Sequence, residues 1–174
     1  MPLPLTIPNE AIQQLKLLVF DFDGVFTDNT VYVDQHGVES VRCWRSDGLG
    51  IQKALALGLP CYVLSTEVNP VVSARCKKLK LPCIQGQEDK REALVNLAAE
   101  RGIPLEHVAY LGNDINDLGC LEAVGLPLVV RDAYPEAVAA ALYQTEKPGG
   151  FGAVREVCDW IVACRQLNQI TIPQ

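Results

Sequence analysis

Short apolar runs alternate with longer amphipathic stretches along most of this chain of 174 residues. An apolar run bounded by polar residues is typical of a buried strand, and apolar positions three and four apart are typical of a helix. The pattern predicts strands at Lys16–Phe20, Cys61–Leu64, Pro82–Ile84, Val108–Leu111 and Leu126–Val130. It predicts helices at Gly48–Leu57, Pro70–Leu79, Glu88–Arg101, Ile115–Ala123, Pro135–Leu142 and Ala153–Arg165. This alternation indicates an α/β fold with a mostly parallel sheet and right-handed crossovers.

One segment, residues 30–42, departs from this alternation. Its two short stretches of apolar and polar residues flank Asp34-Gln35-His36-Gly37, which predicts a β-hairpin with a glycine-containing turn. Because the hairpin closely follows the first strand, we expect it to form a flap beside the end of that strand. The polar tail, residues 166–174, is expected to be flexible unless a neighbouring subunit orders it. The sequence has no internal repeat, so we expect residues 1–174 to form a single domain.

Composition narrows the classes of function. The chain is 49% hydrophobic, which suits one substantial core, and its formal net charge is −6. It has no basic run that would neutralise phosphates, so we expect no nucleic-acid partner. It shows no signal-peptide pattern and no apolar run of about 18 residues, so we expect no membrane association and a cytoplasmic location. Its seven cysteines are scattered and lack Cys-x-x-Cys spacing, which predicts small buried side chains.

Two aspartates, Asp21 and Asp23, end the first apolar run. Side chains alternate along a strand, so these two carboxylates point the same way. Ligands bind at the carboxyl ends of the strands in an open α/β sheet. Two carboxylates held together repel each other unless they share a cation or a proton. The pair therefore predicts an active site, with one carboxylate as nucleophile or metal ligand and the other as proton donor.

Further polar residues follow the later strands. Ser65-Thr66 offers a hydroxyl and backbone N–H groups, Lys90 lies at the start of a helix, and Gly112-Asn113-Asp114 follows another apolar run. Asp117 lies three residues beyond Asp114 on the same helical face. Taken singly, Ser65 would satisfy backbone groups and Lys90 would be a solvated helix residue. Their positions at successive strand ends favour one shared site.

In this order the residues resemble the four motifs of the haloacid dehalogenase-like superfamily of phosphotransferases. The motifs are Asp21-Phe22-Asp23-Gly24-Val25, Ser65, Lys90 and Gly112-Asn113-Asp114-Ile115-Asn116-Asp117. The resemblance extends over nearly the whole chain and implies a three-layer, Rossmann-like α/β fold with helices on both faces. The intervals on either side of Ser65 are too short for a helical cap domain.

The resemblance implies a mechanism. Asp21 would attack phosphorus to form an aspartyl-phosphate, and Asp23 would act as general acid and then general base. Mg²⁺ would be the cofactor, held by Asp21, the backbone carbonyl of Asp23, Asp114 and waters. Ser65 and Lys90 would bind the transferring phosphoryl group. Asp117 is assigned to the metal site as a ligand or as a residue that positions one; the alternative is that it stabilises a helix N-terminus.

Two further segments, residues 45–51 and 149–156, resemble the capless phosphatases of 3-deoxy-octulosonate 8-phosphate and nonulosonate 9-phosphate. Those enzymes resemble one another in forming homotetramers, and in each homotetramer neighbouring subunits complete each active site. The resemblance implies that Arg45, Asp47 and Gly48 line the substrate cleft and that Arg155 lies near a neighbour's site. The alternative for Arg155 is a solvated helix side chain.

The substrate implied is a small phosphorylated 2-keto-3-deoxy sugar acid. Octulosonate enzymes usually carry Gly-Arg where this chain has Thr66-Glu67, whereas Glu67 together with Lys78 is similar to the nonulosonate enzymes. Thr66 and Glu67 are therefore assigned to the sugar, and Arg75 or Lys78 to its carboxylate. We expect a nonulosonate 9-phosphate ahead of octulosonate 8-phosphate. The alternative is that Glu67 and Lys78 belong to an ion-paired surface helix.

Two other functions stay open at this point. A non-enzymatic phosphate-binding domain, kept for regulation or oligomerisation, would retain much of the motif set. An open site would also suit a phosphoprotein phosphatase, although a net charge of −6 does not favour anionic peptides. Phosphate release separates the first alternative from an enzyme, and the oligomeric state bears on the second.

Overall fold

A computed structural model describes residues 9–169 of the chain. Its centre is a six-stranded parallel sheet with the strand order β5-β4-β1-β6-β7-β8. The strands are β1 (Leu17–Phe20), β4 (Cys61–Leu64), β5 (Cys83–Ile84), β6 (Val108–Gly112), β7 (Leu126–Val129) and β8 (Tyr143–Gln144). The five predicted strands are all present, which confirms the α/β class.

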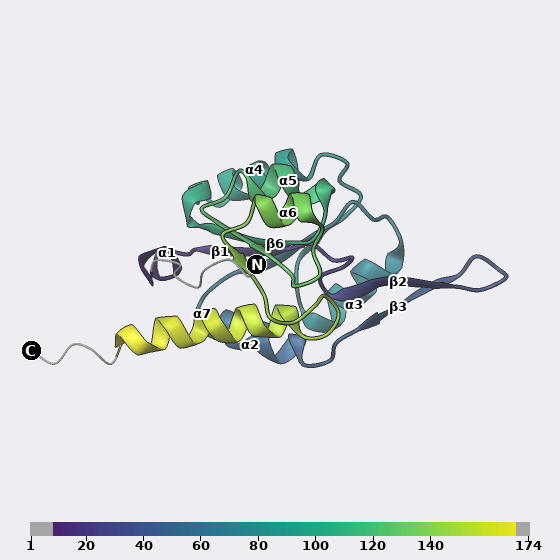
Figure 1. Cartoon of the computed structure of the whole chain (residues 1–174), viewed down its shortest axis with the longest axis horizontal. Coiled ribbons are helices and arrows are strands. Elements are labelled where there is room, and N and C mark those ends of the chain that lie inside the picture. Colours follow the sequence, from purple (N-terminus) through teal and green to yellow (C-terminus); the bar gives the residue numbers. More distant parts are fainter. Residues whose placement is uncertain (1–8, 170–174) are drawn as a thin grey trace, which may run out of the picture.

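Helices cover both faces of the sheet (Figure 1). One face is covered by α1 (Asn9–Gln13), α2 (Asp47–Ala56), α3 (Pro70–Leu79) and α7 (Ala153–Gln169), and the other by α4 (Lys90–Glu100), α5 (Leu118–Leu121) and α6 (Pro135–Ala139). In β1, Leu18 and Phe20 join the first core cluster, while Leu17 and Val19 join the second. A strand buried on both faces requires a continuous apolar run, as the sequence has here. The predicted three-layer arrangement is confirmed.

The predicted hairpin is formed by β2 (Thr27–Val33) and β3 (Glu39–Cys43), an antiparallel pair that projects from the body of the molecule (Figure 1). Asp34 organises its turn, because Oδ1 accepts hydrogen bonds from the backbone N–H groups of His36 and Val38 at 2.8 and 2.9 Å. Gly37 supplies the positive φ of 76° that the turn needs. Between β1 and β4 the described chain forms this hairpin and α2, and no cap domain.

The helix predicted after β6 is divided in two. A 3₁₀ turn, η2 (Ile115–Asp117), precedes the short helix α5. The carboxylate of Asp117 accepts hydrogen bonds from the backbone N–H groups of Asn113 and Asp114, at 2.8 and 3.3 Å. These bonds tighten the first turn, so the segment does not continue as one regular helix.

The helix predicted at Pro135–Leu142 ends at Ala139, and the chain then forms β8. The reason is tertiary pairing: the backbone N–H groups of Leu142 and Thr145 donate to carbonyls of the β7 segment, at 2.9 Å each. Pairing with the sheet overrides the helical preference of the alanine-rich sequence.

The C-terminal helix α7 extends to Gln169, beyond its predicted end at Arg165. Arg165 stabilises this extension, since its guanidinium donates to the carbonyls of Ile12 and Leu15. Residues 166–169 of the predicted tail are therefore helical, and residues 170–174 lie outside the described part. No helix within residues 9–169 is long and apolar enough to cross a membrane.

Most of the cysteines are core side chains, as predicted. All seven are free thiols. Cys61, Cys76, Cys120 and Cys158 are buried, and the other three are partly buried. Burial raises the pKa of the Cys61 and Cys120 thiols to about 12, which keeps them protonated and unreactive.

Candidate active site

Three adjacent strands bring the sequence motifs to one edge of the sheet. β1 lies between β4 and β6, and all three are parallel, so their carboxyl ends meet. Asp21 directly follows β1, Ser65 follows β4, and Asn113 follows β6. The backbone N–H of Asp21 donates to the carbonyl of Leu111 at 2.9 Å, which fixes the loop after β1 against β6. The predicted gathering of the motifs is observed.

Lys90 lies beneath this edge, at the first residue of α4, with only 2% of its surface exposed. Its Nζ lies 2.8 Å from Oδ1 of Asp21 and 2.6 Å from Oδ1 of Asp117. Burial works against the charged ammonium, but the two carboxylates outweigh it and raise the pKa of Lys90. An ammonium carries three N–H donors, so one donor is left after these two contacts.

Asp117 is fully buried, and both of its oxygens have partners. Oδ1 accepts from Lys90 and from the phenol of Tyr110 at 2.7 Å, and Oδ2 accepts from the backbone N–H groups of Asn113 and Asp114. The carboxylate therefore holds the loop after β6 and fixes Lys90 at the same time. This arrangement favours a positioning role for Asp117 over direct metal ligation.

Tyr110 is a residue that sequence reasoning missed. It is buried in β6, and its hydroxyl donates to Asp117. Burial and the neighbouring charges of Asp117 and Asp21 raise the pKa of Tyr110, so the phenol stays a donor at neutral pH. The available signal was a single phenol inside the otherwise aliphatic run Val108–Leu111.

The charges of this cluster do not balance. Burial, followed by the negative charge of Asp117, raises the pKa of Asp21 to about 7, although Lys90 acts in the opposite direction. Burial and the charge of Glu67 also raise the pKa of Asp23. A raised pKa suits Asp23 for donating a proton near neutral pH. Keeping Asp21 ionised at neutral pH requires more positive charge than Lys90 alone supplies.

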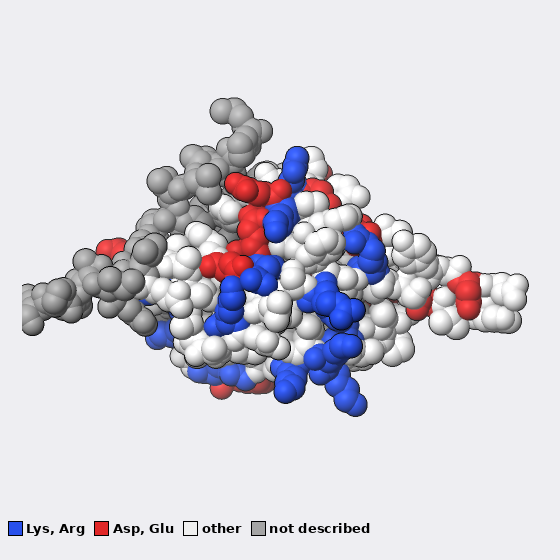
Figure 2. All heavy atoms as spheres, turned by 90° about the horizontal axis from the view of Figure 1, so that it is seen from below, with Lys and Arg blue, Asp and Glu red and all other residues white. Residues whose placement is uncertain are grey.

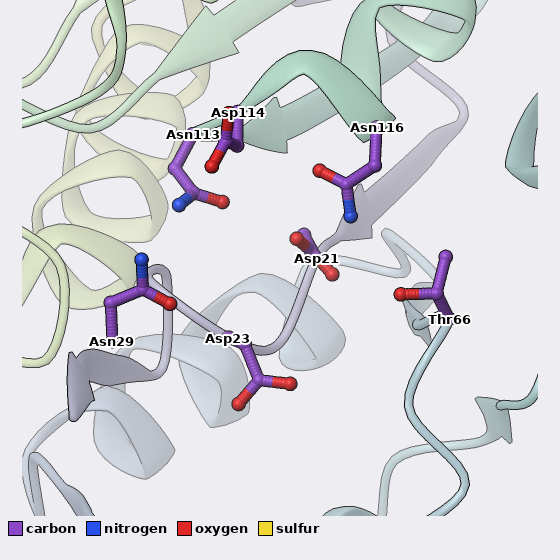
Figure 3. Close-up of a pocket in the computed structure, with 7 residues that line it drawn as sticks. All are labelled: Asp21, Asp23, Asn29, Thr66, Asn113, Asp114 and Asn116. Atoms are coloured by element: carbon purple, nitrogen blue, oxygen red, sulfur yellow. The ribbon is translucent and has the colours of Figure 1, made fainter. Parts of the chain in front are cut away.

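A cavity of about 70 Å³ opens above this cluster (Figure 3). Its lining residues are Asp21, Asp23, Asn29, Thr66, Asn113, Asp114 and Asn116. Four of these belong to the predicted site, and the three asparagines do not. The volume suits a small ion with a few waters, since a water in the liquid takes about 30 Å³. Ser65 and Lys90 lie behind the lining and are almost completely buried.

The loop that carries Asp23 depends on Thr27. The buried hydroxyl oxygen of Thr27 accepts hydrogen bonds from the backbone N–H groups of Gly24 and Asn29, at 3.0 and 3.2 Å. Asn29 has a positive φ of 62°, a conformation that asparagine adopts more readily than most residues. This turn places Asn29 at the cavity, and its sequence alone gave no reason to select it.

The predicted substrate residues near the cavity are held by their own loop. Oε1 of Glu67 accepts from the backbone N–H groups of Val68 and Asn69, at 2.7 and 2.8 Å. The hydroxyl of Ser65 accepts from the N–H of Glu67 at 3.1 Å. Glu67 is therefore a fixed carboxylate close enough to Asp23 to raise its pKa. Thr66 is exposed and lines the cavity.

The other predicted substrate residues do not line this cavity. They are Arg45, Asp47, Gly48, Arg75, Lys78 and Arg155. Arg75 donates to the carbonyl of Trp44 at 3.3 Å, and Arg155 donates to the carboxylate of Asp159 and, at 3.5 Å, to the carbonyl of Ser46. Asp47 is buried and accepts from the backbone N–H of Arg155 at 3.1 Å. The two guanidiniums thus clamp the turn before α2, and Arg155 is an ion-paired helix side chain.

Basic side chains gather on the face that carries α2, α3 and α7 (Figure 2). Although the sequence has no basic run, these helices contribute Lys53, Arg75, Lys77, Lys78 and Arg155. The fold therefore builds a positively charged area from dispersed residues, despite the net charge of −6.

Gly149 and Gly150 lie against the loop after β1 of the same chain. A Cβ on Gly149 would lie 1.8 Å from the carbonyl oxygen of Gly24, and Gly150 donates its N–H to the carbonyl of Val25 at 3.0 Å. Any side chain at Gly149 would therefore displace the loop that carries the two aspartates. These glycines support the site within their own chain.

The donors at the cavity suit a hard divalent cation. They are carboxylate and amide oxygens, the ligands that Mg²⁺ and Ca²⁺ prefer. Within residues 9–169, no three His, Cys, Asp or Glu side chains form a metal cluster on their own. The predicted set needs only two side chains, those of Asp21 and Asp114, with a backbone carbonyl and waters. The residues present fit that set.

Comparison with known proteins agrees with this geometry. The family model of haloacid dehalogenase-like hydrolases matches residues 75–156. The 3-deoxy-D-manno-octulosonate 8-phosphate phosphatase KdsC of Escherichia coli K12 is 36% identical over 151 residues, which are 86% of this chain and 80% of that protein. The enzyme of the same name from Yersinia pestis is 34% identical, over 90% and 86% of the two chains.

Solved structures give the same result. A haloacid dehalogenase-family hydrolase from Streptomyces avermitilis is 44% identical with a TM-score of 0.86, over 90% of this chain and 89% of the other. The octulosonate 8-phosphate phosphatase of Moraxella catarrhalis, solved with a magnesium ion, a phosphate ion and a KDO molecule, is 34% identical with a TM-score of 0.87, over 91% of each chain. The chain thus belongs to the haloacid dehalogenase-like family and is a phosphatase of that family.

Proposed function

We propose that this protein hydrolyses the phosphate monoester of a phosphorylated 2-keto-3-deoxy sugar acid. The main support is the contact of 2.8 Å between Lys90 and Asp21, beneath a cavity that Asp21 and Asp23 both line. Asp21 as nucleophile, Asp23 as proton donor and the buried positive charge of Lys90 are thereby brought together at one site. The single-domain organisation and the cytoplasmic location expected from the sequence are parts of this proposal.

The reaction would proceed in two steps. In the first, a carboxylate oxygen of Asp21 attacks phosphorus, the bond from phosphorus to the sugar oxygen breaks, and Asp23 gives its proton to the leaving alkoxide. In the second, Asp23 takes a proton from a water that attacks the aspartyl-phosphate, which releases inorganic phosphate and restores Asp21. The remaining N–H of Lys90 would donate to a phosphoryl oxygen, and the hydroxyl of Ser65 would assist.

Mg²⁺ is the proposed cofactor. Asp21, Asp114 and the backbone carbonyl of Asp23 would hold it, and Asp117 would act through Lys90 and the loop after β6. When bound, the cation supplies positive charge to the phosphoryl oxygens and to Asp21. The proposal is supported by the excess negative charge of the site. It is also supported by relatives solved with magnesium from Moraxella catarrhalis and with cobalt from Haemophilus influenzae.

The sugar must lie largely outside the cavity, because about 70 Å³ accommodates little more than the phosphoryl group and cation. Glu67, fixed by its own loop, would accept hydrogen bonds from sugar hydroxyls or an amine, with Thr66 beside it. Lys78 or Arg75 on α3 would pair with the sugar carboxylate. This pattern favours a nonulosonate 9-phosphate, whereas the named relatives act on octulosonate 8-phosphate. We keep both as candidates, with the nonulosonate first.

We also propose a homotetramer whose subunits complete one another's sites. The support is the hairpin, whose apolar side chains Val31, Tyr32, Val33 and Val38 are 48–63% exposed. Exposed apolar side chains concentrated in one projecting element are typical of an interaction surface. An open cavity and a hairpin that extends away from it are consistent with walls supplied by a neighbouring copy.

A phosphate-release screen tests the proposed function. The purified protein with MgCl₂ is given octulosonate 8-phosphate, several nonulosonate 9-phosphates, an aryl phosphate and a phosphoserine peptide. We expect turnover of at least one sugar-acid phosphate above the others. Asp21→Asn should abolish it, while the matched change Glu122→Gln, at an exposed carboxylate, should not. Preference for the phosphopeptide, or no release from any substrate, would refute the proposal.

A further inference from the structure

Asn29 reaches the cavity from an irregular part of the hairpin. In the β2–β3 ladder, Thr27 pairs with Cys43. Four residues further along β2, Val31 pairs with Val41, which is only two residues away on β3. The extra residues of β2 bulge out of the ladder, with Asn29 at their centre. Bulges next to active sites commonly redirect a side chain, and this one places Asn29 at the cavity (Figure 3).

The backbone of Asn29 has a conformation that glycine would adopt at lower cost. Its φ is 62°, a region in which residues other than glycine are strained. Thr27 maintains this conformation, because its hydroxyl oxygen accepts a hydrogen bond from the N–H of Asn29 at 3.2 Å. Strain of this kind is concentrated at functional sites. The presence of an asparagine at this position therefore points to a use of its amide.

The amide of Asn29 is not used within the described part of the protein. The side chain is exposed, and within residues 9–169 its amide makes no hydrogen bond. The amide of Asn113, which lines the same cavity, differs: it packs against Gly24, where a Cβ would lie 2.1 Å from its Nδ2. An amide carries both donors and an acceptor. Asn29 thus offers unused hydrogen-bonding groups to a molecule in the cavity.

Exposure orders the lining residues from the floor of the cavity to its mouth. Asp21 is 3% exposed, Asp23 is partly buried and Asn29 is exposed. In the proposed reaction, Asp21 attacks phosphorus and Asp23 gives its proton to the leaving oxygen. The atoms that follow the leaving oxygen must therefore lie further out, at the level of Asn29. In Figure 3, Asn29 and Thr66 lie on opposite sides of Asp23, so Asn29 flanks the path of the leaving group.

The charges near the mouth indicate which group of the substrate would lie there. Burial raises the pKa of Asp23, and so do the negative charges of Glu67 and Glu39, although Lys90 acts in the opposite direction. Two carboxylates near Asp23 would repel a carboxylate of the substrate. An uncharged hydroxyl, by contrast, can both donate to an amide and accept from it. The hydroxyl nearest to the leaving oxygen is the one on the adjacent carbon.

We infer that Asn29 is a specificity-determining residue whose amide hydrogen-bonds to the hydroxyl on the carbon next to the phosphorylated carbon of the substrate. This inference rests on the proposed function, since it uses the roles of Asp21 and Asp23. It deepens that function by naming one group that the substrate must carry. Sugar acids are polyhydroxylated, so both candidate substrates offer such a hydroxyl. The contact also explains why β2 bulges at the cavity and why position 29 is not glycine.

The experiment compares two small phosphomonoesters that differ only in this hydroxyl. Glycerol 3-phosphate carries it, and 3-hydroxypropyl phosphate lacks it. Wild type, Asn29→Gly and Thr30→Gly are assayed with MgCl₂. Glycine suits the positive φ at position 29 and removes the amide. Thr30→Gly is the matched control, because Thr30 is the next residue of β2, is exposed and does not line the cavity.

We expect the wild type to favour glycerol 3-phosphate about tenfold in kcat/KM. A larger preference is not expected, because water can solvate an exposed amide that lacks its hydroxyl partner. Asn29→Gly should bring the ratio of the two kcat/KM values to within about twofold of unity, whereas Thr30→Gly should keep the wild-type ratio. If turnover of both esters is too slow, the ratio is taken from their inhibition constants against an aryl phosphate. Asn29→Gly should melt within about 3 °C of the wild type.

A wild type that does not distinguish the two esters would overturn the inference. So would an Asn29→Gly variant that keeps the wild-type ratio, because a structural role, or a contact with the phosphoryl group, would slow both esters alike. If Asn29→Gly does not fold, Asn29→Ala also lacks the amide and is judged by the same ratio. The test is separate from the proposed function. A ratio that depends on Asn29 in a protein that hydrolyses no sugar-acid phosphate refutes only the function. A sugar-acid phosphatase whose ratio ignores position 29 refutes only this inference.

Discussion

Lys90 and Asp117 form a buried ion pair in which Nζ lies 2.6 Å from Oδ1 and neither side chain is more than 1% exposed. The same ammonium reaches Asp21 at 2.8 Å, so one positive charge serves two carboxylates. The pair therefore links α4, the loop after β6 and the loop after β1. It positions Asp21 and at the same time leaves the cluster short of positive charge.

Removing this ammonium should be costly. In Lys90→Met, Asp21 and Asp117 would be left buried and uncompensated, which typically lowers the free energy of unfolding by about 3–5 kcal/mol. Phosphatase activity should fall with it. Urea denaturation measures the change, with Lys53→Met as the control, because the Lys53–Asp159 pair is 48% and 39% exposed and should contribute about 0–1 kcal/mol. Equal losses in the two variants would contradict the assigned role.

Tyr110 should stabilise the charged form of Asp117. Tyr110→Phe removes a hydrogen bond of 2.7 Å to a buried carboxylate, for which we expect a loss of about 1–3 kcal/mol in the free energy of unfolding. Tyr62→Phe is the matched control, since the contact of Tyr62 with Arg101 is through its ring and persists in phenylalanine. If both variants unfold at the same urea concentration, the phenol does not support Asp117.

Asp47 should make stability fall as the pH rises. Burial raises the pKa of Asp47 to about 6 from an ordinary 3.8, so between about pH 4 and pH 6 the folded protein holds a proton that the unfolded chain has lost. Asp47→Asn removes this contribution. The free energy of unfolding of Asp47→Asn relative to wild type should rise by roughly 3 kcal/mol across that interval and stay constant above pH 7. This figure takes about 1.4 kcal/mol for each unit of difference in pKa.

Unfolding curves at several pH values check this prediction. The difference between Asp47→Asn and wild type isolates Asp47 from the other titrating groups. Glu122→Gln, a change at an exposed carboxylate, should give a difference that does not vary with pH. A flat difference for Asp47→Asn as well would show that the carboxyl ionises normally in the folded state.

Glu67 and Lys78 should set the preference between sugar acids. Glu67→Gln removes a fixed negative charge beside Asp23, and Lys78→Met removes a positive charge on α3. For each variant we expect the ratio of kcat/KM for nonulosonate to octulosonate substrate to fall about tenfold, the effect of roughly 1.4 kcal/mol. Lys77→Met, at the adjacent exposed position, should leave the ratio unchanged. An unchanged ratio in all three variants would remove both residues from substrate recognition.

The hairpin should control the oligomeric state. The double variant Val31→Asp/Val33→Asp replaces two exposed apolar side chains with carboxylates. Burying these charges in an interface between subunits is unfavourable. Light scattering should give the mass of a tetramer for the wild type and a smaller assembly for the variant. Gln35→Glu adds charge at the hairpin turn without removing an apolar side chain, and its mass should match the wild type. A monomeric wild type would refute the proposed assembly.

The ends of strands were the most predictable part of the molecule. Asp21 and Asp114 each follow an apolar run, and such a run ends where polar side chains can reach solvent or a ligand. The same logic placed Ser65. The sequence could not show that β1 lies between β4 and β6, because strand order depends on the crossovers and not on local pattern. That order is what brings the three motifs together.

Residues of ordinary type were the least predictable. Nothing in the sequence distinguishes Asn29 from any loop asparagine, because its importance comes from a positive φ. Asn113 stands in the fourth motif, but the sequence does not show that its amide oxygen is buried without a partner. Arg155 was assigned to substrate, yet its guanidinium is used within the chain. An arginine can satisfy a carbonyl, a carboxylate or a ligand equally well, so residue type alone does not decide among them.

The close approach of Gly24 to the Asn113 amide has an evolutionary consequence. Any larger residue at position 24 would collide with the amide, and shrinking position 113 would still leave the backbone at 24 in a conformation that costs other residues about 1–2 kcal/mol. Substitutions at position 24 are therefore disfavoured for two independent reasons, the contact and the backbone conformation. Across homologous sequences, position 24 should therefore stay glycine whichever residue stands at position 113, although nearly ninety residues separate the two along the chain.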